Sequence, residues 1–188
     1  RDASKEEILE RINNNTITDI LNKIEVKAGD VVMVKAGTIH AIGAGVFICE
    51  IQQNSNCTYR MYDYDRRDKF GNPRELHVKK ALDVVDNHKY VKDNKTEVVI
   101  ARNEHFTEER LVQCKYFEVY KYDVNDEAKI TVDEASFVSV LFINGSGTIE
   151  TDDYEKTMEF KAGDSFFVSA GLRSIIVKGQ ATMVVTRV

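Results

Sequence analysis

From residue 24 onward the chain alternates short apolar runs with turn residues such as Asn144-Gly145 and Lys178-Gly179. Runs of β-prone residues bounded by Gly, Asn and Asp are typical of strands. Many short strands at close intervals indicate an all-β barrel or sandwich. The predicted strands are residues 47–53, 58–63, 97–101, 117–124, 129–132, 137–143, 147–151, 159–161, 165–168, 174–177 and 181–187.

Helical patterns are confined to three short stretches. Ile8, Leu9 and Ile12 share one helical face, and the preceding segment Ser4-Lys5-Glu6-Glu7 reads as a capping box. A further helical turn is expected over residues 16–21 and a helix over 78–85, whereas residues 64–76, which hold the only proline, read as a long loop.

One segment occurs twice. Residues 26–40 read VKAGDVVMVKAGTIH and residues 160–174 read FKAGDSFFVSAGLRS. In each copy a Gly-Asp turn precedes a short strand run, and a second glycine turns the chain again. Such a repeat indicates two copies of one folding unit. The first copy ends in His40 and the second in Ser174, so only the first offers a metal ligand at this position.

Composition excludes several classes of protein. The chain of 188 residues is 43% hydrophobic and 30% charged, with a net charge of −5, as in an ordinary globular protein. A nucleic-acid partner is not expected without a basic face, and no apolar run approaches a membrane span. Cys49, Cys57 and Cys114 share no zinc-ribbon spacing, which favours reduced thiols and a cytoplasmic location.

The densest polar cluster is residues 40–67. Strand alternation surrounds Glu50 with apolar neighbours, and a carboxylate there is costly without a partner. A hairpin across residues 54–56 would bring Arg60 back toward Glu50. The alternatives are an edge strand with Glu50 in water and a surface or structural ion pair for Arg60.

The cluster resembles a known family. His40-Ala41, then Glu50-Ile51-Gln52-Gln53-Asn54-Ser55-Asn56 and Thr58-Tyr59-Arg60, are similar to the signature of type I mannose-6-phosphate isomerases, whose barrels belong to the cupin superfamily. The resemblance continues through Tyr62-Asp63-Tyr64-Asp65-Arg66, Arg74-Glu75-Leu76-His77 and Lys80-Ala81-Leu82-Asp83-Val84. Asn56 replaces a frequent Asp, and Lys35 replaces a frequent Pro.

The resemblance implies an aldose–ketose isomerase that interconverts mannose 6-phosphate and fructose 6-phosphate, a small sugar phosphate, at a Zn²⁺ site. His40 matches a zinc ligand and Arg60 the catalytic arginine. Glu50 matches an active-site carboxylate that positions Arg60 or moves a proton. The expected substrate contacts are Gln52, Ser55 and Tyr59. The cations available for the phosphate are Arg66, Arg67, Lys79 and Lys80, although each can also be a solvated surface charge. The histidines that match no ligand position are His77, His88 and His105.

The other zinc ligands of the family are a Gln-x-His pair and a Glu upstream of the region matched here, and this sequence contains no Gln-x-His. The resemblance therefore implies a C-terminal fragment that is inactive alone and holds zinc weakly or not at all. Expected domains are residues 1–24, a remnant of a helical insertion; 25–90, the end of an incomplete catalytic double-stranded β-helix barrel with a connecting helix; and 91–188, a complete metal-free barrel. Unpaired barrel edges predict a homodimer, or completion by a separate N-terminal piece.

Two functions fit these observations. The first is the isomerase. The second is a degenerate cupin that binds a sugar phosphate for sensing or regulation without metal catalysis. Because the set His40, Glu50, Gln52, Ser55, Thr58 and Arg60 matches the isomerase pattern throughout, the sequence favours the first.

Overall fold

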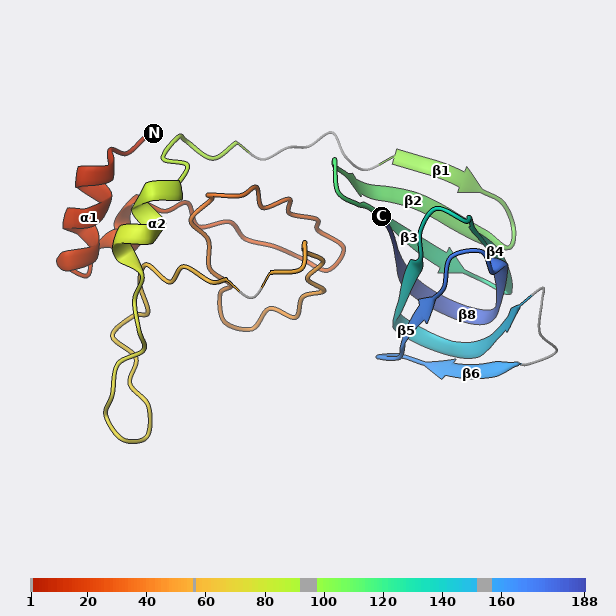
Figure 1. Ribbon diagram of the computed structural model, residues 1–188. Coiled ribbons are helices and arrows are strands. Elements are labelled where there is room, and N and C mark those ends of the chain that lie inside the picture. Colours follow the sequence, from red (N-terminus) through yellow and green to blue (C-terminus); the bar gives the residue numbers. More distant parts are fainter. Residues whose placement is uncertain (1, 56, 92–97, 152–156) are drawn as a thin grey trace. The chain divides into compact units, whose positions relative to one another are not determined.

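The computed structural model describes residues 2–55, 57–91, 98–151 and 157–188 of two compact units, Arg1–Lys92 and Asp93–Val188. The first contains helices and long connecting segments, and the second consists of antiparallel strands (Figure 1). Within the described ranges, no helix is long and apolar enough to cross a membrane.

The helices of the first unit form one small core. Helix α1 spans Lys5–Asn13 and begins as the capping box predicts, since the backbone N–H of Glu7 donates to Ser4 Oγ at 3.1 Å. The 3₁₀ helix η1 spans Ile17–Ile20, and α2 spans Val78–Val84. The buried members of their shared cluster are Ile8, Ile12, Ile17 and Val85, and among the half-buried side chains packed against it are Ile39, Met61 and Tyr62.

Between η1 and α2 the strand predictions are wrong. Residues 47–53 and the described residues around 58–63 form no strand, and the only β-bridge described in this region joins Arg67 to Pro73. The side chain of Phe47 is 95% exposed. An extended segment becomes a stable strand only beside a hydrogen-bonded neighbour and over an apolar layer, and the described part of this unit provides neither for these residues.

The described residues of the second unit form one eight-stranded antiparallel sheet, mainly β as the sequence predicts. Its strand order is β1-β2-β3-β8-β5-β6, with β4 paired to β8 and β7 to β5. The strands are β1 Val98–Arg102, β2 Phe106–Gln113, β3 Glu118–Val124, β4 Glu127–Val132, β5 Val138–Thr151, β6 Met158–Lys161, β7 Ser165–Val168 and β8 Arg173–Arg187. The two long strands change neighbours along their length, because β5 pairs first with β7 and then with β6, and β8 first with β4 and then with β3.

Strand β2 has no counterpart among the predicted strands. Its sequence FTEERLVQ lacks a clear apolar alternation, but Glu108 and Glu109 have partners across the ladder to β3. Glu108 accepts a hydrogen bond from the Tyr122 hydroxyl at 2.6 Å, and Lys121 lies 2.9 Å from Glu109. Such cross-strand pairs stabilise a polar strand that apolar patterning alone misses.

The turn signals at residues 144–147 and 178–179 do not end strands. Strands β5 and β8 run through them, with a register shift between Phe142 and Asn144. A Cβ atom at Gly145 would lie 1.9 Å from the Gln180 carbonyl oxygen, and one at Gly179 would lie 2.5 Å from that of Ser146. These glycines thus let two backbones approach where the paired strands bend.

Replacing Gly145 by alanine is expected to destabilise the protein by about 3 kcal/mol, because a strained φ and a steric clash act together. Gly145 has φ +88° and its new Cβ would meet backbone. Gly163 is a matched control, since it has φ +92° and nothing within 4 Å of an added Cβ. G163A should lose only about 1 kcal/mol. Urea unfolding measures both, and equal losses would contradict the close-approach explanation.

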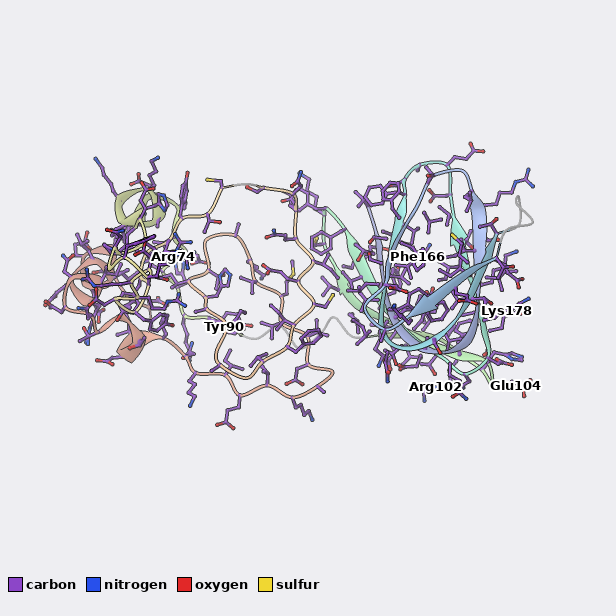
Figure 2. All side chains as sticks on the ribbon, turned by 90° about the horizontal axis from the view of Figure 1, so that it is seen from below. Arg74, Tyr90, Arg102, Glu104, Phe166 and Lys178 are labelled. Carbon is purple, nitrogen blue, oxygen red and sulfur yellow. The ribbon has the colours of Figure 1, made fainter. Side chains whose placement is uncertain are left out.

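The core of the second unit lies inside its curled sheet. Phe142 stacks on Phe160 at a centroid distance of 3.7 Å, and Met183 and Val185 are fully buried beside them. Figure 2 shows side chains of this unit, Phe166 among them, gathered between the strands. This sheet has the extent expected for the domain at 91–188, whereas residues 25–90, expected to hold the end of an incomplete barrel and a connecting helix, form α2 and no strand among the described residues.

Candidate functional site

The two repeated segments share one turn geometry. In the first, the N–H of Lys27 donates to Asp30 Oδ2 at 3.0 Å and the N–H of Asp30 to the Lys27 carbonyl at 3.1 Å. In the second, the equivalent bonds between Lys161 and Asp164 measure 2.9 and 3.1 Å. Because the intervening glycines have φ +93° and +92°, both copies need Gly before Asp. The sequence repeat is therefore also a repeat of local structure.

After the turns, the two copies diverge. The second continues into β7, and its last residue, Ser174, is 1% exposed in β8 opposite Thr131. The first forms no strand, and its last residue, His40, is exposed. The position that is a core hydroxyl in the second unit is thus an accessible imidazole in the first.

His40 is held in one orientation by its own loop. Its Nδ1 lies 2.9 Å from the Thr38 carbonyl oxygen, so Nδ1 carries the proton and donates. The Gly37 carbonyl accepts from the Asp86 N–H at 2.9 Å, and Ile39 packs on the helical cluster. These contacts leave Nε2 with its lone pair toward solvent, the arrangement usual for a metal-binding histidine.

Arg60 is half-buried and bound to the segment that precedes α2. Its Nη1 donates to the Glu75 carbonyl at 3.2 Å, and its backbone N–H donates to His77 Nδ1 at 3.3 Å. The next residues, Met61 and Tyr62, pack on the same helical cluster as Ile39. The segments that carry Arg60 and His40 are therefore anchored on one core.

The structure does not bring Glu50 to Arg60. Glu50 is exposed, and no hydrogen bond or ion pair joins the two among the described residues. The expected hairpin is absent because residues 47–53 form no strand, so this prediction is not realised in the first unit. Gln52 is likewise exposed on this segment.

Ser55 and Tyr59 lie around a thiol. Ser55 Oγ accepts from the Cys57 N–H at 3.2 Å. A hydrogen bond with the Cys57 side chain raises the pKa of Tyr59, whose ring centroid lies 6.3 Å from that of His77. Among the described site residues predicted from the sequence, Tyr59 is thereby linked to Arg60 through His77, which contacts both. Sequence matching did not indicate this role of His77.

The described residues provide one metal ligand rather than a metal site. No group of three or more His, Cys, Asp or Glu side chains that could hold an ion occurs in the ranges that the structure describes. His40 has the chemistry and orientation of a zinc donor, but a single imidazole does not bind a divalent ion tightly.

A buried carboxylate that the sequence did not single out organises the nearby cations. Asp63 is 6% exposed, is hydrogen-bonded to Arg66, and lies 3.6 Å from Arg74 Nη1. Arg67 pairs with Asp65 at 3.1 Å. Arg74, drawn in Figure 2, thus belongs with Arg66 to an ion-pair cluster. Both guanidiniums remain more than half exposed and could still meet an anion.

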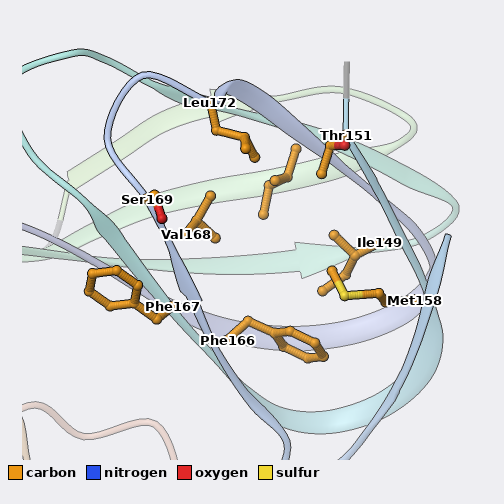
Figure 3. Close-up of a pocket in the computed structure, with 9 residues that line it drawn as sticks. Ile149, Thr151, Met158, Phe166, Phe167, Val168, Ser169 and Leu172 are labelled. Atoms are coloured by element: carbon orange, nitrogen blue, oxygen red, sulfur yellow. The ribbon is translucent and has the colours of Figure 1, made fainter. Parts of the chain in front are cut away.

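The second unit has a cavity of about 230 Å³ between β5, β6, β7 and β8. Phe166, Leu172 and Met158 point into it (Figure 3). Among the described residues that line it, the polar side chains are those of Thr151 and Ser169. The described residues that line the cavity include no charged side chain to pair with a phosphate, whereas the site residues expected from the sequence lie in the first unit.

Comparison with known proteins gives concordant matches. Residues 107–188 match the family model described as mannose-6-phosphate isomerase, cupin domain. The putative mannose-6-phosphate isomerase YvyI of Bacillus subtilis is 40% identical over 190 residues, which cover 98% of this chain and 57% of YvyI. ManA of the same organism, a mannose-6-phosphate isomerase, is 32% identical over 194 residues, with the same two coverages.

A solved structure agrees over the whole chain. The crystal structure of the mannose 6-phosphate isomerase from Bacillus subtilis superposes with a TM-score of 0.88 at 38% identity, covering 100% of this chain and 58% of that one. The mannose-6-phosphate isomerase of Streptococcus mutans is 38% identical over 146 residues, which cover 78% of this chain and 45% of that protein. The chain thus spans little more than half the length of the first two relatives, 57% of each.

Proposed function

We propose that the protein to which this chain belongs interconverts mannose 6-phosphate and fructose 6-phosphate. The chain belongs to the mannose-6-phosphate isomerase family. The observation that carries the proposal is the match over 98% of the chain to a relative of that name at 40% identity. Arg60 lies in the matched region with its guanidinium held by the Glu75 carbonyl, which supports a fixed cation in the site.

The reaction moves a proton between C2 and C1 of the sugar through an enediol-like state. Negative charge develops on the two oxygens of that state, and a preorganised guanidinium stabilises such charge in a partly desolvated site. We assign this role to Arg60. Glu50 is assigned to move the proton or to position Arg60, and this requires segment 46–53 to come to Arg60 in the working enzyme. Gln52, Ser55 and Tyr59 are assigned to substrate contacts.

We assign His40 as a metal ligand through Nε2, because its Nδ1 is committed to the Thr38 carbonyl. A divalent ion such as Zn²⁺ supplies a Lewis acid that polarises a substrate oxygen. The described residues contribute this one imidazole and no cluster of three ligands. Arg66 and Arg74 are the cations we assign to the phosphate, since Asp63 keeps both side by side.

The test is an isomerase assay of two samples, the gene-encoded protein and the isolated 188-residue chain. We expect turnover of mannose 6-phosphate by the first and none by the second, because the described residues of the second offer a single metal ligand. Fructose 6-phosphate is measured by a coupled enzyme assay after addition of Zn²⁺. If the gene-encoded protein bound mannose 6-phosphate without converting it, the proposed isomerase function would be wrong, and the protein would be a sugar-phosphate-binding module.

A further inference from the structure

His77 holds the backbone of Arg60 from two directions. The N–H of His77 donates to the Arg60 carbonyl at 2.7 Å, and the N–H of Arg60 donates to His77 Nδ1 at 3.3 Å. The second bond requires Nδ1 to be unprotonated, because only a nitrogen lone pair accepts. The His77 side chain is 25% exposed, so water competes only partly for this contact.

The His77 side chain does not cap helix α2, although His77 lies at the start of that helix. His77 is the N-cap of α2, and its carbonyl accepts from the Ala81 N–H at 2.9 Å. An N-cap side chain commonly accepts from one of the next backbone N–H groups, yet His77 makes no such bond. Its ring is turned to Arg60 instead. Helix capping therefore does not explain the orientation of this side chain.

The same short segment also holds the guanidinium. The Glu75 carbonyl accepts from Arg60 Nη1 at 3.2 Å, and the Glu75 carboxylate lies 3.8 Å from His77 Nε2. The segment that holds both ends of Arg60 thus begins α2, whose Val78 and Leu82 pack on the helical core. A side chain fixed at its backbone and at its head group loses little freedom when it meets a developing charge.

We propose that His77 is a positioning residue for Arg60, acting through the Nδ1 acceptor on the Arg60 backbone. This inference rests on the proposed function for its catalytic consequence and on the observed contacts for its geometry. His77 touches neither substrate nor metal in this role. Losing the acceptor frees the backbone that directs the guanidinium, and a displacement of about 1 Å costs on the order of 100-fold in rate.

Two variants separate the acceptor from the mere size of the ring. In H77N the amide oxygen occupies roughly the place of Nδ1 and can accept from Arg60, whereas in H77Q the polar group reaches the place of Nε2. We expect H77Q and H77A to lower kcat of the gene-encoded enzyme by about 10- to 100-fold with KM changed less, and H77N to stay within a few-fold of the parent.

Amide hydrogen exchange of Arg60 in the 188-residue chain provides a readout without activity. We expect faster exchange in H77Q and parent-like exchange in H77N, because only the latter keeps an acceptor for this N–H. Equal exchange and equal kcat in H77N and H77Q would overturn the proposal, as would a loss in thermal stability with kcat unchanged. If the parent enzyme showed no isomerase activity, the proposed function would be wrong. Amide exchange would still test whether His77 Nδ1 accepts from the Arg60 N–H.

Discussion

Replacing Arg60 by alanine is expected to lower kcat for mannose 6-phosphate by about 100- to 1,000-fold, the range seen when one preorganised donor to a developing oxyanion is removed. The change removes a charge that the Glu75 carbonyl holds in place. Since Arg60 contacts no metal ligand assigned here, metal content should not change. Steady-state kinetics and elemental analysis of the same sample measure the two effects.

The matched control is Arg11 on α1, which pairs with Asp19 at 3.6 Å and with Glu7 at 4.0 Å. R11A removes the same charge from the first unit and should cost less than about 1 kcal/mol of stability, with kcat intact. Turnover in R60A equal to that in R11A would show that the assignment of Arg60 is wrong. A lower metal content in R60A would show that the variant disturbs the loop of His40.

Patterns that operate over a few residues were predictable from this sequence. The Gly-Asp turns of both repeats form because each glycine must adopt positive φ and each Asp closes the turn on the backbone N–H three residues earlier. The Ser4 cap is local in the same sense. Each depends on neighbours in sequence alone, so no distant partner can overrule it.

Elements that depend on distant partners were harder to predict. Gly145 and Gly179 read as turn residues, yet each lies in a long strand because its lack of a Cβ admits the opposing backbone. Residues 47–53 read as a strand from their composition, but composition does not supply the neighbour that a ladder needs. Runs of apolar residues thus form strands in the second unit, whereas residues 47–53 of the first unit form none.

The candidate site shows the same division. Matching short motifs predicted His40 and Arg60 as site residues, and the structure anchors the segments that carry them on the helical core. Motif matching did not identify the roles of Asp63 and His77, because Arg74 comes near Asp63 and Arg60 near His77 only after the loop 64–76 folds back. Charge and residue type alone do not distinguish a histidine that accepts from a backbone N–H from one in solvent.

Replacing His40 by alanine is expected to weaken Zn²⁺ binding by the gene-encoded protein by more than about 100-fold, since loss of a residue that merely supports a ligand already costs 10- to 100-fold. The reason is geometric as well as chemical: the Thr38 carbonyl fixes Nδ1–H at 2.9 Å, so Nε2 is oriented before the metal arrives. Isomerisation should fall with metal occupancy and recover in part when Zn²⁺ is raised. Competition with a chelator and elemental analysis measure the affinity directly.

His88 is the matched control for that experiment, because it is an exposed histidine of the same unit whose Nδ1 lies 2.8 Å from Asp86 Oδ1. The hydrogen bond to Asp86 raises the pKa of His88, and His88 matches no zinc-ligand position of the family pattern. H88A should therefore keep its zinc. If H40A and H88A retained zinc equally, His40 would be no ligand, and its orientation would have to serve the loop alone.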